Sequence, residues 1–134
     1  QWGSHFLTAW EIFKDNPILG IGPKNFRIES CATKYENIDS ASAKKRCTTH
    51  PHNIIFEILS EHGLLGMLLF LVLLYLIIKG VKINYEHNIF FLISLLICLW
   101  PIGTSGSIFT TVNGTFLWIN IGIILYSKDK DLFT

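Results

Sequence analysis

The residues best suited to chemistry are the histidines of the run His50-Pro51-His52-Asn53, which lies just ahead of a long apolar stretch. An imidazole that is neutral near pH 7 is a competent general base. If a helix begins at Asn53, its end beside His52 also presents backbone N–H groups that can hold an anion such as a phosphate. Two interpretations of His52 stay open: a general base beside an anion site, and a residue that only helps to cap the helix.

Further side chains around this run can bind ions. Cys47, His50 and His52 are potential metal ligands, but their spacing is not a standard zinc pattern. We therefore expect no metal and no cofactor. The chain also carries cations that either bind an anionic substrate or simply face solvent, and they are Lys24, Arg27, Lys34, Lys44, Lys45 and Arg46. Arg27 stands out because a guanidinium binds phosphate oxygens through two parallel hydrogen bonds.

The helix that positions these groups is expected to begin at Asn53, a favourable N-cap. No charged residue interrupts the sequence between Gly63 and Ile78. A helix over about residues 57–79 is therefore long enough to cross a hydrocarbon layer of ~30 Å. Gly63 and Gly66 would let a neighbouring helix approach closely.

Two glutamates lie one helical turn apart near the start of that helix. Glu57 and Glu61 can orient an imidazole or help to activate a hydroxyl. A solvated helix face is the expected interpretation, because the apolar residues Ile54, Ile55, Ile58 and Leu59 lie on the other side.

The N-terminal residues predict two short helices that meet at a turn. Residues 4–15 place apolar side chains at helical spacing, and these are Phe6, Ala9, Trp10 and Phe13. Pro17 ends this helix, and the run Gly20-Ile21-Gly22-Pro23 forms a turn. A second short helix follows, with Phe26 as its apolar anchor. The first helix is expected either to lie along a membrane surface or to form part of a small soluble cap.

Residues 30–49 are polar and lack periodicity, which is typical of a loop. Cys31 and Cys47 bracket this loop. Outside the cytoplasm, a disulfide between them is the natural interpretation. Closing a loop of this length would stabilise the fold by roughly 3 kcal/mol in the chain-entropy model. Two unrelated thiols are the alternative.

The distribution of charge divides the chain into two parts. Half of the 134 residues are apolar, which is too many for an ordinary soluble domain. Residues 1–62 carry seven basic and seven acidic side chains, whereas residues 63–134 carry seven charges in all. We expect an all-α integral membrane protein, with a helical loop region over residues 1–62 and a membrane region over residues 63–134. Its transmembrane helices, about three, are expected near 57–79, 89–103 and 112–126. The balanced charge argues against nucleic acid as a partner.

Basic residues determine the expected orientation across the membrane. Lys79 and Lys82 follow the first span, Lys128 and Lys130 follow the third, and the connection after the second has no Lys or Arg. The positive-inside rule places these basic segments in the cytoplasm. The loop region and its histidines then face outward, which in a bacterium is the periplasm.

Four motifs resemble those of a known family. They are Asp15-Asn16-Pro17-Ile18-Leu19-Gly20-Ile21-Gly22, Asn25-Phe26, His50-Pro51-His52-Asn53 and Glu61-His62-Gly63-Leu64-Leu65-Gly66. Their order and spacing are similar to those of the O-antigen ligase and polymerase superfamily. The most specific piece is His52-Asn53, followed after nine residues by Gly63-x-x-Gly66. The motifs cover about residues 5–75, and the rest of the chain resembles the family in hydropathy only.

The resemblance implies a multi-pass protein of the bacterial inner membrane with its site on a periplasmic loop. Such a protein moves glycans from undecaprenyl diphosphate to an acceptor, which is lipid A–core in ligases and another lipid-linked repeat unit in polymerases. The resemblance assigns the essential histidine to His52 and implies that basic residues hold the carrier diphosphate. Many relatives have an Arg before the first loop helix, where this chain has Gln1-Trp2-Gly3-Ser4-His5. Two alternatives stay open: His5 replaces that Arg as a diphosphate contact, or the contact comes from a preceding part of the protein.

The predicted site therefore has His52 as its base. The residues predicted to bind the diphosphate or glycan are His5, Lys24, Arg27, Arg46, His50 and Asn53. An inverting transfer without a metal is expected, because the diphosphate carries charge well as a leaving group. A repeat-unit polymerase is the alternative within the family, and a non-catalytic transport or scaffold segment is the alternative outside it. The chain opens at Gln1 without a signal-peptide pattern, so we expect the C-terminal part of a longer membrane protein, which need not be active alone.

Overall fold

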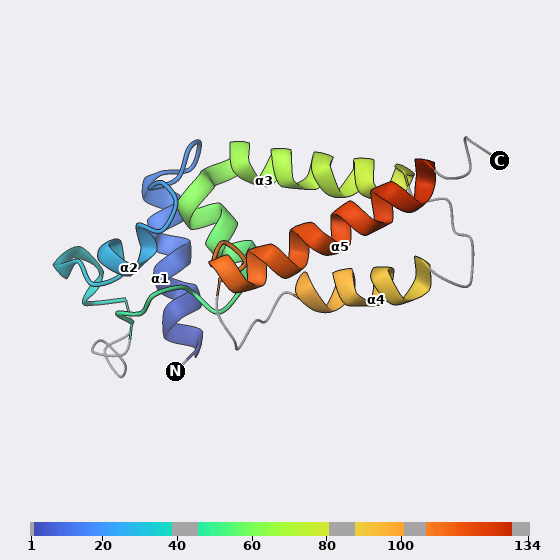
Figure 1. The fold of residues 1–134 in the computed structure, drawn as a ribbon. Coiled ribbons are helices and arrows are strands. Elements are labelled where there is room, and N and C mark those ends of the chain that lie inside the picture. The colour runs from blue at the N-terminus through green and yellow to red at the C-terminus, as the bar shows by residue number, and fades with distance from the viewer. Residues whose placement is uncertain (1, 39–45, 81–87, 101–106, 130–134) are drawn as a thin grey trace. The chain divides into compact units, whose positions relative to one another are not determined.

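The computed structural model describes residues 2–38, 46–80, 88–100 and 107–129, and the regular elements in these ranges are all helices. They are α1 (Trp2–Asp15), α2 (Phe26–Glu29), the 3-10 helix η1 (Thr33–Tyr35), α3 (Ile54–Gly80), α4 (Asn88–Cys98) and α5 (Thr111–Asp129) (Figure 1). The predicted all-α class is thereby confirmed for the described residues. The chain forms two compact units, one of Gln1–Leu69 with Pro101–Ser107 and the other of Phe70–Trp100 with Ile108–Thr134.

Helix α1 buries a face that differs from the predicted one. Its buried residues recur at the three- and four-residue spacing of one helix face, and they include His5, Thr8, Ala9 and Ile12. Trp10, which belonged to the predicted apolar face, is exposed. The small side chains of Thr8 and Ala9 allow α1 to pack closely, whereas Phe6 and Phe13 of the predicted apolar face are only half-buried.

The core of the first unit joins α1 to the segments that follow it. Phe26 is completely buried at the start of α2, as predicted for its apolar anchor. It belongs to one cluster with Ala9, Ile12 and Tyr35. The Tyr35 hydroxyl donates a hydrogen bond to the Asp15 carboxylate at the end of α1 (2.8 Å). Because burial raises the pKa of Tyr35 to about 12, the hydroxyl keeps the proton that this bond requires.

Helix α3 is interrupted within the predicted span. Gly63 has a φ of 65° and a ψ of −163°, so the segments 54–62 and 64–80 meet at a kink (Figure 1). This backbone conformation is essentially restricted to glycine. Gly63 does admit a close neighbour, but the neighbour is the irregular turn after α1 rather than a helix. The Ile18 carbonyl occupies the space that a Cβ at position 63 would need.

The turn after α1 satisfies the main-chain groups that the kink exposes. Four N–H···O bonds of 2.8–3.1 Å cross the gap, from Ile21 to Ser60, from Gly22 to Glu61, from Leu64 to Pro17 and from Leu65 to Ile18. A buried backbone group without a partner would be costly, so these bonds offset part of the cost of breaking the helix. We call this joint of residues 17–22 and 60–65 the clasp.

The second unit contains the end of α3 together with α4 and α5. Helices α4 and α5 pack against each other. The buried apolar residues of this unit form one cluster, which consists of Ile77, Leu95, Leu117 and Ile121. Cys98, a free thiol, packs at the edge of this cluster.

Among the described residues, α3 is the one helix long and apolar enough to cross a membrane, judged by length and composition over Ile54–Lys79. Helix α4 has 11 residues, which makes it ~16 Å long and too short for a hydrocarbon layer of ~30 Å. The spans at 89–103 and 112–126 therefore stay predictions. Lys82 and Lys130, on which the predicted orientation also depends, lie outside the described residues.

Candidate active site at the start of helix α3

Asn53 begins α3 and organises the backbone beside it. Its side-chain Oδ1 accepts hydrogen bonds from the N–H groups of Ile55 (2.9 Å) and Phe56 (3.2 Å). Its carbonyl accepts a third bond from the Glu57 N–H (2.9 Å). This is N-cap geometry, as the sequence predicts. The cap uses two N–H groups that an anion would otherwise bind, so part of the anion site expected at this helix end is already occupied.

His52 precedes the cap in an uncommon backbone conformation. Its φ is 57°, which lies in the left-handed region that few non-glycine residues adopt. Because Asn53 supplies the cap, His52 is not needed for that purpose. Its Nδ1 atom is buried without a hydrogen-bond partner in the part of the chain that the structure describes. Strained residues of this kind cluster at functional sites.

Three histidines meet at this point and form what we call the histidine cluster. The ring centroid of His52 lies 4.2 Å from that of His50 and 5.4 Å from that of His5. His5 comes from α1 and is only 4 % exposed. Each ring has one buried nitrogen that lacks a hydrogen-bond partner among the described residues. Such atoms are rare in folded proteins and mark places where a ligand or water can bind.

Burial favours the neutral form of two of these rings. Desolvation lowers the pKa of His5 and that of His50 below the usual 6.5, and the nearby His52 lowers both further. A hydrogen bond to the Arg46 backbone acts on His5 in the opposite direction. The Thr49 hydroxyl lies 3.0 Å from His50 Nδ1. A neutral imidazole has one donor and one acceptor nitrogen, so the cluster can accept a proton from a substrate and donate hydrogen bonds to it.

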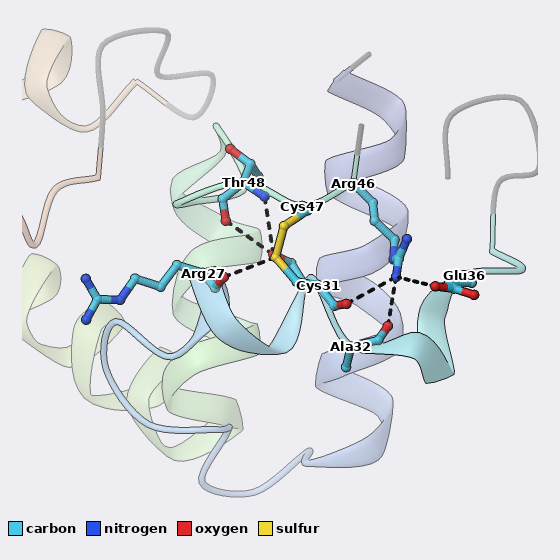
Figure 2. The surroundings of a disulfide bond; sticks show 8 residues. Arg27, Cys31, Ala32, Glu36, Arg46, Cys47 and Thr48 are labelled. Atoms are coloured by element: carbon cyan, nitrogen blue, oxygen red, sulfur yellow. Dashed lines mark hydrogen bonds and ion pairs between the residues drawn. A yellow bond between two sulfur atoms is a disulfide. The ribbon is translucent and has the colours of Figure 1, made fainter. Parts of the chain in front are cut away.

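A disulfide supports one side of the cluster. It links Cys31 to Cys47, the two cysteines that bracket the predicted loop (Figure 2). Arg46 is buried beside it, and its guanidinium donates hydrogen bonds to the carbonyls of Ala32 (2.9 Å) and Cys31 (3.4 Å). Because the Arg46 backbone bonds to His5, the disulfide and the guanidinium together hold the loop against the histidines.

The cations predicted to bind substrate do not form one group. Figure 2 shows the guanidinium groups of Arg27 and Arg46 on opposite sides of the disulfide. Arg27 and Lys24 are exposed side chains, whereas Arg46 is bound to main-chain carbonyls. The structure thus brings together His5, His50, His52 and the Arg46 backbone, and it leaves Lys24 and Arg27 at the surface.

Both glutamates of α3 are buried, so the expected solvated face is wrong. Glu57 and Glu61 are 4 % and 2 % exposed. The Glu61 carboxylate accepts hydrogen bonds from the N–H groups of Lys24 (2.8 Å) and Phe26 (3.1 Å). It therefore caps the start of α2 from a distant part of the chain. Ser107 lies within hydrogen-bonding reach of the Glu57 side chain. These partners are remote in sequence, so no local pattern reveals them.

Sequence reasoning also missed how His5 reaches the site. The available signal was its helical spacing from Ala9 and Ile12, which places all three on the buried face of α1.

No group of three or more metal-ligating side chains suited to an ion occurs within residues 2–38, 46–80, 88–100 and 107–129. Within the described residues the arrangement is a group of three imidazole rings, in which burial lowers the pKa of His5 and that of His50.

Comparison with known proteins adds a family to this geometry. A family model described as O-antigen ligase matches residues 5–71, which is half of the chain. The matched segment contains the histidine cluster and the clasp. No curated protein and no solved structure gives a significant match to the chain.

Proposed function

The chain belongs to the O-antigen ligase family, and from this premise we propose that it is a glycosyltransferase acting on a glycan linked to undecaprenyl diphosphate. The proposed acceptor is a hydroxyl of lipid A–core. The observation that carries the proposal is the histidine cluster, because it places two imidazole neighbours, the buried His5 and the half-buried His50, around His52 within the matched residues.

In the proposed reaction His52 is the general base. It takes the proton of the acceptor hydroxyl while the hydroxyl oxygen attacks the anomeric carbon of the donor sugar. The new glycosidic bond forms as the bond from that carbon to the diphosphate oxygen breaks, with inversion at the carbon. Undecaprenyl diphosphate leaves as an anion, and the proton then passes from His52 to water.

His5 and His50 are the proposed partners of the leaving diphosphate. Their rings flank His52. The neutral His50 ring can donate one hydrogen bond. One His5 nitrogen already bonds to the Arg46 backbone, so His5 donates through its other nitrogen, Nδ1, when the ring is protonated. A bound diphosphate would also favour the protonated forms, which adds charge attraction. Arg46 is proposed to act indirectly, because its guanidinium is already bonded to carbonyls. Since the leaving group carries its own charge well, the proposal needs no metal.

The remaining predicted site residues have lesser parts in the proposal. Asn53 is assigned to the helix cap that holds His52 in place. Lys24 and Arg27 are exposed and are proposed contacts for the outer sugars or charges of the donor.

The proposed location is the bacterial inner membrane, with α3 as a span and the histidine cluster on the periplasmic side. The length and composition of α3 support a span. The Cys31–Cys47 disulfide supports the orientation, because disulfides persist in oxidising compartments such as the periplasm. A periplasmic surface site is also where the diphosphate of a lipid carrier would lie.

The test replaces His52 in cells that lack the native copy. His52→Asn removes the base but keeps a residue type that tolerates a positive φ. Lys14→Gln, an exposed change on α1, is the control, and equal membrane levels are verified for both. Lipopolysaccharide and carrier-linked glycan are then compared on gels. We expect His52→Asn to reduce transfer by at least ~100-fold, as loss of a general base does.

The form of the defect separates the candidate activities. Loss of capped lipid A–core, with long glycan accumulating on the carrier, is the result expected of a ligase. Loss of long chains, with single repeats still attached, identifies a repeat-unit polymerase instead. An unchanged ladder shows that His52 is structural and rejects the catalytic proposal.

A further inference from the structure

Two large aliphatic side chains are exposed at the tip of the turn after α1. Ile18 and Leu19 are 68 % and 66 % exposed, although the helices before and after the turn both contribute to the core. Turns are normally built from polar or small residues. A pair of adjacent, exposed aliphatic side chains on a turn therefore indicates a nonpolar neighbour outside this unit.

The clasp places this turn at a definite level along α3. The N–H groups of Leu64 and Leu65 donate to the carbonyls of Pro17 (2.8 Å) and Ile18 (3.1 Å). The turn thus lies beside the first residues after the kink at Gly63. From that level onward the sequence of α3 is free of charge up to Ile78. Its exposed side chains near the turn are leucines, at positions 64, 65, 68 and 69.

Three polar backbone groups of the turn are already satisfied within the protein. Pro17 has no N–H, its carbonyl and that of Ile18 are bonded to α3, and the Gly20 N–H donates to the Asn16 carbonyl (3.0 Å). Hydrocarbon penalises irregular backbone unless its polar groups are satisfied within the protein. Exposed charged residues, Lys14 and Lys24, flank the turn in sequence, as expected where a segment passes through lipid headgroups.

We propose that the Ile18–Leu19 turn is inserted among the acyl chains of the bilayer, at the depth of the first turn of α3 after Gly63. The inference rests on the proposed function in one respect, since it takes α3 to be a membrane span. The unit that carries the histidine cluster is then anchored by two adjacent elements, the span and the turn. This double anchor holds the cluster at a constant height above the lipid, where a carrier diphosphate is presented.

Insertion is tested by fluorescence quenching of the protein reconstituted in phosphatidylcholine vesicles. The background is Cys98→Ser, in which the remaining two cysteines are held in the disulfide. Leu19→Cys, Ile28→Cys and Leu68→Cys are labelled one at a time with the fluorophore NBD. Ile28 is the matched control because it is 65 % exposed but lies on α2, and Leu68, 57 % exposed, reports on the span.

The expected result is that lipids brominated on their acyl chains quench NBD as strongly at position 19 as at position 68, whereas aqueous iodide quenches at position 28 alone. Iodide quenching at position 19, with lipid quenching at position 68, overturns the inference and leaves the span intact. Protection from both quenchers at position 19 also overturns it, since another protein segment then covers the turn. Absence of lipid quenching at position 68 would show that α3 does not span the bilayer, and it would contradict the proposed membrane location as well as the insertion of the turn.

Discussion

At the scale of single residues, His5 and His50 link protonation to the folding of the site. Burial lowers the pKa of both rings, so the unfolded chain binds more protons than the folded one just below pH 6.5. The stability that the neutral rings contribute is therefore present above the unfolded pKa. It is lost as pH falls through the folded pKa values.

We accordingly expect the stability that these two rings contribute to the first unit to fall when the pH falls from about 7.5 to about 5. The loss of stability over this range should therefore be smaller in His5→Gln, which cannot take up the proton, than in the unmodified protein. Amide hydrogen exchange in α1 and in residues 54–62, corrected for intrinsic rates, measures the effect. Lys14→Gln should behave like the unmodified protein. The same acid sensitivity in His5→Gln would show that the buried ring is not its source.

The Glu61 carboxylate also stabilises the structure. Its carboxylate binds two main-chain N–H groups, and a Gln amide would turn an NH2 group toward one of them. We expect Glu61→Gln to lower the free energy of unfolding by ~1.5–3 kcal/mol, the range for hydrogen bonds to charged groups. Denaturant melts in detergent measure this change. Glu11→Gln, at a surface pair with Lys14, should change the free energy of unfolding by less than ~1 kcal/mol. If Glu11→Gln lowers it as much as Glu61→Gln does, the two hydrogen bonds of Glu61 are not the source of the loss.

At the scale of elements, the clasp depends on glycine. Gly63 combines a positive φ with the Ile18 carbonyl in the place of a Cβ. We expect Gly63→Ala to destabilise the first unit by at least ~2 kcal/mol, because strain and overlap add. Gly3→Ala, in α1 with open space around it, should instead gain up to ~1 kcal/mol from helix propensity. Thermal unfolding of both variants measures these changes. If the two variants unfold at similar midpoint temperatures, the kink at Gly63 is not required for stability.

Local rules explain which elements could be predicted from the sequence. The start of α3 at Asn53 and the anchor Phe26 follow from capping, proline and apolar patterns that act over a few residues. The kink at Gly63 could not be predicted, because the groups that fill it come from the turn after α1. The meeting of His5 with His52 was hidden for the same reason, since it depends on how α1 packs rather than on either local sequence.

At the scale of the whole molecule, the disulfide and the basic residues lead to the same predicted topology. An engineered Asn37→Cys lies at an exposed position of the unit that carries the disulfide and, in the Cys98→Ser background, offers one reactive thiol. We expect a membrane-impermeant maleimide to label it in spheroplasts without lysis, because a disulfide-bearing unit belongs outside the cytoplasm. Labelling that requires lysis would reverse the orientation. Cys98 in the unmodified protein serves as the reference for a thiol inside a predicted span, that at 89–103.

The clasp also has a consequence for how freely this region can vary. Its four bonds join main chain to main chain, so their strength is nearly independent of which side chains occupy positions 17, 18, 60, 64 and 65. A comprehensive substitution library should therefore show a sharp contrast at this joint. Gly20 and Gly63 should accept almost no replacement, since any Cβ there overlaps neighbouring backbone. Pro17, Ile18, Leu64 and Leu65, which donate and accept two of the bonds and whose side chains are exposed, should be broadly interchangeable, limited only by the polarity of their surroundings.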